Sequence, residues 1–322
     1  MSKSTYKKRN IVCIMLLIFF TTSTIWQGIQ ERIENRKYKP TGIYINTGTY
    51  DASCYVRGKG KHTFVFITGS GTPSAYTDFY YLQEELSQYG QTISFDHAGF
   101  GWSSKTNEKR NIDNQAAELT VLINAFITKD SPVILVCHSL GSLEAIRFSQ
   151  LNRDRVAGII FLDGGSPEYY STASEFTSIL LNRTSAILRI SGINRILGEL
   201  DVLLPFYGEN VRNISLNKKQ QEIDKAMYYK YLGATFNRKN LKLINENAEK
   251  VLEQGNIGNI PILILSSDSG KEWSHVQEQL GNWSTNSKQI DIKGAGHYLH
   301  WTNYKDVIDN IKSFTSSLDL IS

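Results

Sequence analysis

Hydrophobic and polar positions form two kinds of segment after residue 42. Short, continuous apolar runs are typical of buried parallel strands, and the longer segments between them repeat apolar residues at helical spacing. Because the two kinds of segment alternate along the chain, the pattern predicts an α/β fold in which helices cover both faces of a mainly parallel sheet. The predicted core strands are 63–67, 92–96, 132–136, 157–163, 260–265 and 289–292, and the predicted helices around them are 79–89, 112–127, 140–150 and one starting near 304.

Two segments depart from this alternation of strands and helices, one at the start of the domain and one inside it. Alternating residues in 43–46 and 54–56, separated by turn formers, predict a leading hairpin. From about 165 to 255 the chain shows helical patterns, at 187–200 and 220–232 for example, but no convincing core strand. We interpret this stretch as a helical insertion that covers one edge of the sheet. Its aromatic residues, some of which we expect to face a binding site, are Tyr169, Tyr170, Phe176, Phe206, Tyr207, Tyr228, Tyr229, Tyr231 and Phe236.

The N-terminus is a separate unit. Four cationic residues within 3–9 precede the strongly apolar run 11–20, and the stretch 11–29 is just long enough to span a bilayer. No Ala-x-Ala cleavage site follows, so an uncleaved signal-anchor is favoured over a cleaved secretory signal. The acid-free cationic tail predicts a cytoplasmic N-terminus and a single-pass protein of the cell membrane whose folded domain lies outside the cytoplasm. The alternative is a secreted protein.

The predicted organisation is therefore a signal-anchor over 1–29, a charged linker over 30–41 and one folded domain over 42–322. The 35 basic and 31 acidic residues nearly balance, which gives no basic field for a nucleic-acid partner. The three cysteines, Cys13, Cys54 and Cys137, form neither a disulfide framework nor a metal-ligand pattern. Composition therefore indicates an ordinary folded domain without a metal site.

The segment 132–146 carries the strongest chemical signal. A buried-strand run ends in Cys137-His-Ser139-Leu-Gly141, and good helix formers follow at once. A serine on such a sharp turn requires small residues two positions before and two after it, and here these are Cys137 and Gly141. This segment resembles the nucleophile elbow of the α/β-hydrolase superfamily, with Ser139 as nucleophile. The usual pattern has glycine at the position of Cys137. Cysteine also has a small side chain, and it is commonly buried.

Other segments fit the same resemblance. The glycine-rich loop 68–73 follows the strand 63–67, as the family's oxyanion loop does. The resemblance implies that the backbone N–H groups of Ser70 and Leu140 stabilise an oxyanion. The turn 96–103 also resembles a family segment, and we interpret it as structural. The insertion at 165–255 falls where these hydrolases carry their cap.

The resemblance also implies a base and an acid. His297 follows Gly294-Ala-Gly296 after the last strand, in the position of the family's catalytic histidine. Asp268 follows the strand 260–265, where the family keeps its acid, and is the predicted acid. Asp163, one strand earlier, is the alternative because some members carry the acid there. The chain order serine, aspartate, histidine is the order found in α/β-hydrolases.

These residues predict a membrane-tethered serine hydrolase. Ser139 would attack a small-molecule carboxylic ester through an acyl-enzyme, with His297 as base and Asp268 fixing its tautomer. No metal or organic cofactor is expected, and a serine nucleophile argues against the dehalogenase and epoxide-hydrolase branches, which attack with aspartate. Two alternatives remain: the same triad acting on an amide, thioester or carbon–carbon bond or in acyl transfer, and a binding protein that has kept the fold without turnover.

Overall fold

Eight strands form one sheet in the computed structural model, which describes residues 3–128, 131–200 and 216–320. The strand order is β1-β2-β4-β3-β5-β6-β7-β8. All neighbours from β4 to β8 pair in parallel, whereas β1 with β2 and β2 with β4 are antiparallel. The predicted parallel sheet and leading hairpin are therefore confirmed. The strands are β1 (Ile43–Asn46), β2 (Asp51–Arg57), β3 (His62–Ile67), β4 (Gly90–Phe95), β5 (Val133–His138), β6 (Val156–Leu162), β7 (Ile262–Ser266) and β8 (Ser287–Asp291).

Helices cover both faces of the sheet because the central strands are apolar on both sides. On β5, Leu135 and Cys137 belong to one buried cluster and Ile134 and Val136 to another, as the alternation of a strand requires. The first cluster includes side chains of α4 (Ile112–Phe126), α5 (Gly141–Leu151) and α12 (Ile244–Gln254), and the second includes side chains of α3 (Tyr80–Leu86) and α15 (Tyr304–Leu318). The short helices α2 (Ala75–Asp78) and α14 (Leu299–Thr302) and the helix α13 (Lys271–Gly281) complete this body.

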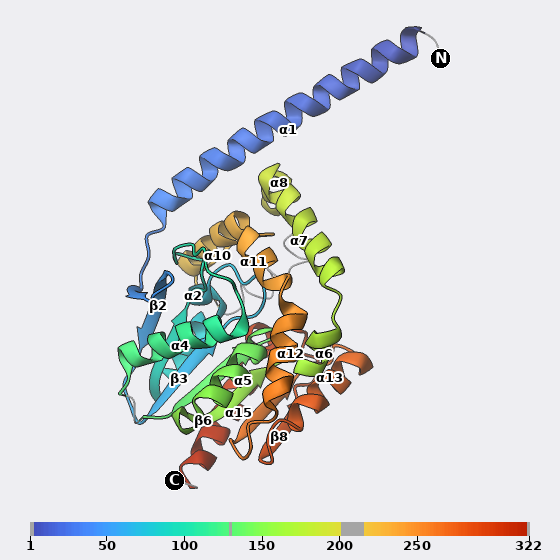
Figure 1. Ribbon diagram of the computed structural model, residues 1–322. Helices are drawn as coiled ribbons and strands as arrows, with labels where there is room; N and C mark the ends of the chain where they lie inside the picture. Colours follow the sequence, from blue (N-terminus) through green and yellow to red (C-terminus); the bar gives the residue numbers. More distant parts are fainter. Residues whose placement is uncertain (1–2, 129–130, 201–215, 321–322) are drawn as a thin grey trace.

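The predicted helical insertion lies between β6 and β7. Its described helices are α6 (Pro167–Thr172), α7 (Glu175–Ile190), α8 (Ile193–Glu199), α10 (Lys218–Tyr231), α11 (Thr235–Leu241) and α12. Figure 1 shows α7, α8, α10 and α11 together beyond one end of the sheet, and we call these four helices the cap. The single predicted helix over 187–200 is two helices, broken at Gly192, whose φ of 75° lies in the left-handed region. Phe206 and Tyr207 lie outside the described residues.

The N-terminal segment is one long helix, α1 (Lys3–Lys37), and among the described residues it is the one helix long and apolar enough to cross a membrane. Most of the predicted charged linker over 30–41 is helical, because α1 continues to Lys37. The cap supplies the reason: Arg195 donates to Gln27 at 2.6 Å and makes a second, bidentate contact with Glu34. In Figure 1, α1 passes beside the tip of α8.

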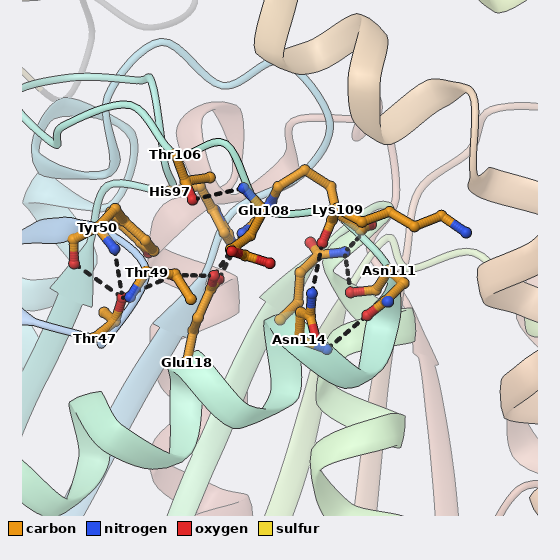
Figure 2. Close-up of polar contacts among 12 residues, drawn as sticks. Thr47, Thr49, Tyr50, His97, Thr106, Glu108, Lys109, Asn111, Asn114 and Glu118 are labelled. Carbon is orange, nitrogen blue, oxygen red and sulfur yellow. Dashed lines mark hydrogen bonds and ion pairs between the residues drawn. The ribbon is translucent and has the colours of Figure 1, made fainter.

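A buried polar network fixes the loop between β4 and α4. Arg110 donates to both carboxylate oxygens of Glu118 at 2.7 Å, and Thr49 donates to the same carboxylate. Figure 2 shows how Glu118 on α4 thereby joins the turn before β2 to this loop. Asn111 then begins α4 by accepting from the backbone N–H of Asn114 at 2.8 Å. The network therefore holds the end of this loop against α4.

Candidate active site

Ser139 stands at the sharp turn between β5 and α5, as the sequence predicts. Its φ of 50° is in the left-handed region, which is strained for a residue with a side chain. Small neighbours make the turn possible: a Cβ on Gly141 would lie 2.8 Å from the carbonyl oxygen of Thr68, and one on Gly69 would lie 3.0 Å from the Cβ of Ser139. Cys137 is fully buried, and burial raises the pKa of its thiol well above the usual value. Cys137 is therefore a core residue rather than a reactive thiol.

His297 lies next to Ser139. It lies in the loop between β8 and α14, and its Nε2 is 3.1 Å from the Oγ of Ser139. The backbone carbonyl of His297 accepts a 3.1 Å hydrogen bond from Nε2 of His138, the residue that precedes the nucleophile. The two predicted residues are thus brought within hydrogen-bonding distance from segments 158 positions apart in the sequence.

The carboxylate next to His297 belongs to Asp163, the alternative acid. Its Oδ2 lies 2.6 Å from Nδ1 of His297, and the side chain is fully buried. The indole N–H of Trp273 donates to the same oxygen at 2.8 Å, and the backbone N–H of Ser267 donates to Oδ1 at 2.8 Å. Because the N–H groups of Trp273 and Ser267 donate to its two oxygens, Asp163 is held in place as an acceptor for the imidazole.

The assignment of Asp268 as the acid is therefore wrong in this geometry. Asp268 is exposed beyond the end of β7, and its carboxylate accepts from the backbone N–H of Gly294. Its own N–H donates to the carbonyl of Ala295 at 2.9 Å. Asp268 thus fastens the loop that carries His297. The backbone at Ser267, one residue earlier, turns toward Asp163 instead.

Of the two expected oxyanion donors, Leu140 adjoins the nucleophile in the chain and Ser70 lies on the loop that packs against it. Leu140 follows Ser139 directly and begins α5, and Gly69, which precedes Ser70, packs against Ser139. Ser70, Gly69 and Leu140 line one small cavity of about 40 Å³. The hydroxyl of Ser70 donates to Asn237 of the cap at 2.9 Å, which ties the loop to α11. The arrangement is compatible with the oxyanion role that the sequence implies.

Polar contacts behind this loop hold it in place. Thr68 lies 2.9 Å from Nδ1 of His97, whose Nε2 lies 2.8 Å from the carboxylate of Glu144 on α5. Asp96 accepts from the backbone N–H of Ala75 at 2.7 Å and from that of Trp102 at 3.1 Å. It therefore joins the start of α2 to the turn 96–103. Burial raises the pKa of Asp96 to about 6, although these hydrogen bonds oppose the shift. These contacts fit the structural interpretation of the turn 96–103.

Two cavities adjoin the nucleophile and the oxyanion loop. One of about 410 Å³ is open to solvent and is lined by Ser139, Tyr169, Tyr170, Ser269, Trp273 and His297. Another, of about 320 Å³, lies between the cap and the oxyanion loop and includes Ser70 in its lining. We call it the cap cavity. Both volumes are in the range of small-molecule sites.

Tyr170 and Trp273 are site residues that the sequence did not single out. Burial raises the pKa of the Tyr170 hydroxyl, and a hydrogen-bonding interaction with Ser139 opposes that shift, so the phenol lies close to the nucleophile. Trp273 packs edge-to-face on the His297 ring at 5.6 Å between centroids. Tyr170 is one of the nine aromatic residues of the insertion, and Trp273 stands in a polar stretch without a motif. The fold alone places them at the site.

Three buried side chains behind the nucleophile, Asp78, His138 and His300, could ligate a metal by residue type. Their ligand atoms lie within 4.8 Å of one another. Nε2 of His300 lies 3.6 Å from Oδ1 of Asp78, within the range of an ion pair. We interpret the set as a buried contact between His300 and Asp78 with His138 packed beside it, where His138 supports the His297 loop.

The sheet order, the serine elbow and the inserted helices define the class of this protein. The family model described as "alpha/beta hydrolase fold" matches residues 62–304, which is most of the chain. The chain therefore belongs to the alpha/beta hydrolase fold family, as its resemblance implied.

Individual relatives are distant. Over 272 residues the chain is 25% identical to the uncharacterized protein YbdG of Bacillus subtilis (strain 168), covering 83% of this chain and 82% of that protein. The solved epoxide hydrolase CorEH superposes with a TM-score of 0.67 at 17% identity, over 86% of this chain and 99% of the other. A thermophilic esterase from Thermogutta terrifontis superposes with a TM-score of 0.58 at 19% identity, over 86% and 99% respectively. At these identities the solved structures support the fold alone.

Proposed function

We propose that this chain is a membrane-tethered serine hydrolase that cleaves carboxylic esters. The observation that carries the proposal is the continuous hydrogen-bonded chain from Ser139 through His297 to Asp163, with distances of 3.1 and 2.6 Å. A nucleophile, a base and a buried carboxylate in this order are the parts that acyl transfer needs. The solvent-open cavity at Ser139 gives an acyl substrate access to them.

The mechanism follows from the roles of these atoms. Ser139 Oγ attacks the acyl carbon while its proton passes to Nε2 of His297, and Asp163 stabilises the imidazolium that forms. The N–H groups of Ser70 and Leu140 would bind the tetrahedral oxyanion. His297 then protonates the leaving alkoxide, which leaves an acyl-enzyme. A water molecule that loses its proton to His297 releases the acid and restores Ser139.

A serine at the elbow favours ester cleavage over epoxide opening. Epoxide hydrolases of this fold attack with aspartate, and here the elbow residue is Ser139. Amides, thioesters, carbon–carbon bonds and acyl transfer use the same serine chemistry, so they are the alternatives to an ester.

Active-site labelling tests the proposal. We expect a fluorophosphonate probe to label the full chain, because a serine next to a neutral histidine reacts with such probes as it does with an acyl group. Among p-nitrophenyl esters of increasing chain length, aminoacyl amides and thioesters, the esters should give the highest kcat/KM. Absence of labelling would instead support a binding protein. Faster turnover of an amide or thioester would contradict the ester assignment.

The tether is a separate part of the proposal. The cationic residues before the apolar run predict that the folded domain lies outside the cytoplasm, held by an uncleaved α1. Protease added to intact cells or protoplasts should therefore remove the domain. The mature protein should begin at Met1 or Ser2. A mature N-terminus near Thr24 would show secretion after cleavage.

A further inference from the structure

The cap carries an apolar stripe on the outer side of α7. Phe176, Leu180, Ile187 and Ile190 each expose between 52% and 76% of their surface. Their spacing places them along one side of the helix, together with exposed Arg183. No acidic residue occurs from 176 to 190. A stripe of large apolar side chains with a cation among them is typical of a helix that lies on an anionic lipid surface.

The polar contacts of α1 determine where this stripe lies relative to the predicted membrane. Ser23 donates to the carbonyl of Ser191, just past the end of α7, at 2.5 Å. A Cβ on Gly192 would lie 2.5 Å from the carbonyl of Ser23, so the two backbones approach closely. Gln27, one turn further along α1, donates to the carbonyl of Tyr229 at 3.1 Å. The cap is therefore fixed to α1 at Ser23 and Gln27.

These contacts fall close to the bilayer. A hydrocarbon layer about 30 Å thick takes about 20 helical residues, so a span that starts at Ile11 reaches Gln30. Ser23 then lies inside the apolar layer, seven residues or about 10 Å before its outer end. Ile187 and Ile190 lie within about one helical turn of Ser191, which contacts Ser23. They therefore lie near the depth of Ser23, which is about the depth to which an interfacial helix buries its apolar face, roughly 5–10 Å.

We propose that the outer face of α7 rests in the outer surface of the bilayer that holds α1, so that the cap is a membrane-docking element. This proposal depends on the membrane tether proposed above. The opposite side of α7 lines the cap cavity through Ser178, Asn182 and Ser185, and Leu181 lies at the rim, where it lines the cavity and is also exposed. One helix therefore separates the lipid from the cavity beside the oxyanion loop. This position suits esters that partition into the bilayer.

Spin labels test the docking directly in the full chain, reconstituted in vesicles of phosphatidylcholine and phosphatidylglycerol. Single cysteines replace Leu180 or Ile187 in a Cys13→Ser background, and the native Cys54 and Cys137 are buried. Leu151→Cys is the matched control, because Leu151 is also apolar and 51% exposed but ends α5 at the edge of the sheet opposite the cap. The measurement is the collision rate of the nitroxide with oxygen and with a water-soluble nickel chelate.

We expect labels at 180 and 187 to collide at least fivefold more with oxygen, relative to nickel, than the label at 151. Equal ratios at the three positions, in protein that remains in the vesicles, would overturn the docking. Protein that leaves the vesicles would overturn the tether instead. Dipolar broadening of the nitroxide spectrum that disappears on dilution with unlabelled protein would show that a second copy of the chain covers the stripe. That result would also overturn the proposal.

Activity provides a second readout. The double variant Leu180→Glu, Ile187→Glu should hydrolyse a long-chain ester in vesicles at least tenfold more slowly, because the charges oppose docking. A soluble short-chain ester should be cleaved within twofold of the wild-type rate, since neither residue lines the described cavities next to Ser139 or Ser70. Leu151→Glu should leave both rates unchanged. An unchanged rate on the vesicle ester in the double variant would contradict the proposal.

Discussion

Ser139→Ala is expected to lower kcat by about a millionfold, the scale found when a triad nucleophile is removed, and to abolish fluorophosphonate labelling. Alanine has no oxygen to attack the acyl carbon, and no acyl-enzyme can form. The loss should come without loss of fold, because alanine is smaller than serine and no backbone contact in the elbow depends on the hydroxyl. Steady-state kinetics on a p-nitrophenyl ester, with a thermal melt of the same sample, measure both effects.

Ser142 offers a matched control one turn along α5. It is buried, and its hydroxyl donates to the carbonyl of Gly165 at 2.6 Å. Ser142→Ala should cost stability of about 1 kcal/mol and leave labelling intact. If Ser139→Ala kept even a tenth of the wild-type labelling, the nucleophile would be another residue.

The sheet and the elbow could be predicted because local sequence determines them. Buried strands such as 132–136 need continuous apolar runs, and the turn at Ser139 needs Gly141 beside it, so both leave a direct pattern in the sequence. His297 was found in the same way, from the glycines that precede it. These features depend on the backbone conformation of a few successive residues, which is what a sequence pattern reports.

The acid could not be chosen from sequence because two neighbouring strands end in an aspartate. Asp163 follows β6 and Asp268 comes shortly after β7, and parallel strands bring both ends to the same edge of the sheet. The structure separates them by contacts from distant segments: Trp273 and Ser267 hold Asp163, whereas Gly294 holds Asp268. Each of these partners lies at least 26 positions away in the sequence from the aspartate that it holds.

Contacts between distant segments also explain why the helical structure of 30–37 could not be predicted from the sequence. The residues 30–37 are highly charged, and alone they indicate a solvated linker. Their helix is stabilised by the cap, where Arg195 contacts Gln27 and Glu34 although it lies more than 160 positions away in the sequence. A tertiary partner of this kind leaves no periodic signal.

Asp163→Asn is expected to lower kcat/KM by about ten thousandfold, the loss found when the triad histidine is set in the wrong tautomer. The 2.6 Å contact with Nδ1 of His297 requires an acceptor at Oδ2, where Trp273 also donates. An asparagine can place its NH₂ group there, so Nδ1 becomes the acceptor and Nε2 carries the proton. His297 can then no longer take the proton of Ser139. The variant changes one atom of the side chain, so a melt should show at most a modest loss of stability.

Asp268→Asn is the matched control, since it makes the same chemical change two residues beyond the end of β7. Its amide oxygen can still accept from the N–H of Gly294, so the His297 loop should keep its position and kcat/KM should fall no more than about fivefold. The two variants are compared on one soluble ester at one pH. A loss of several thousandfold in Asp268→Asn beside a mild effect in Asp163→Asn would return the acid to Asp268. That result would mean that the loop after β7 rearranges when substrate binds.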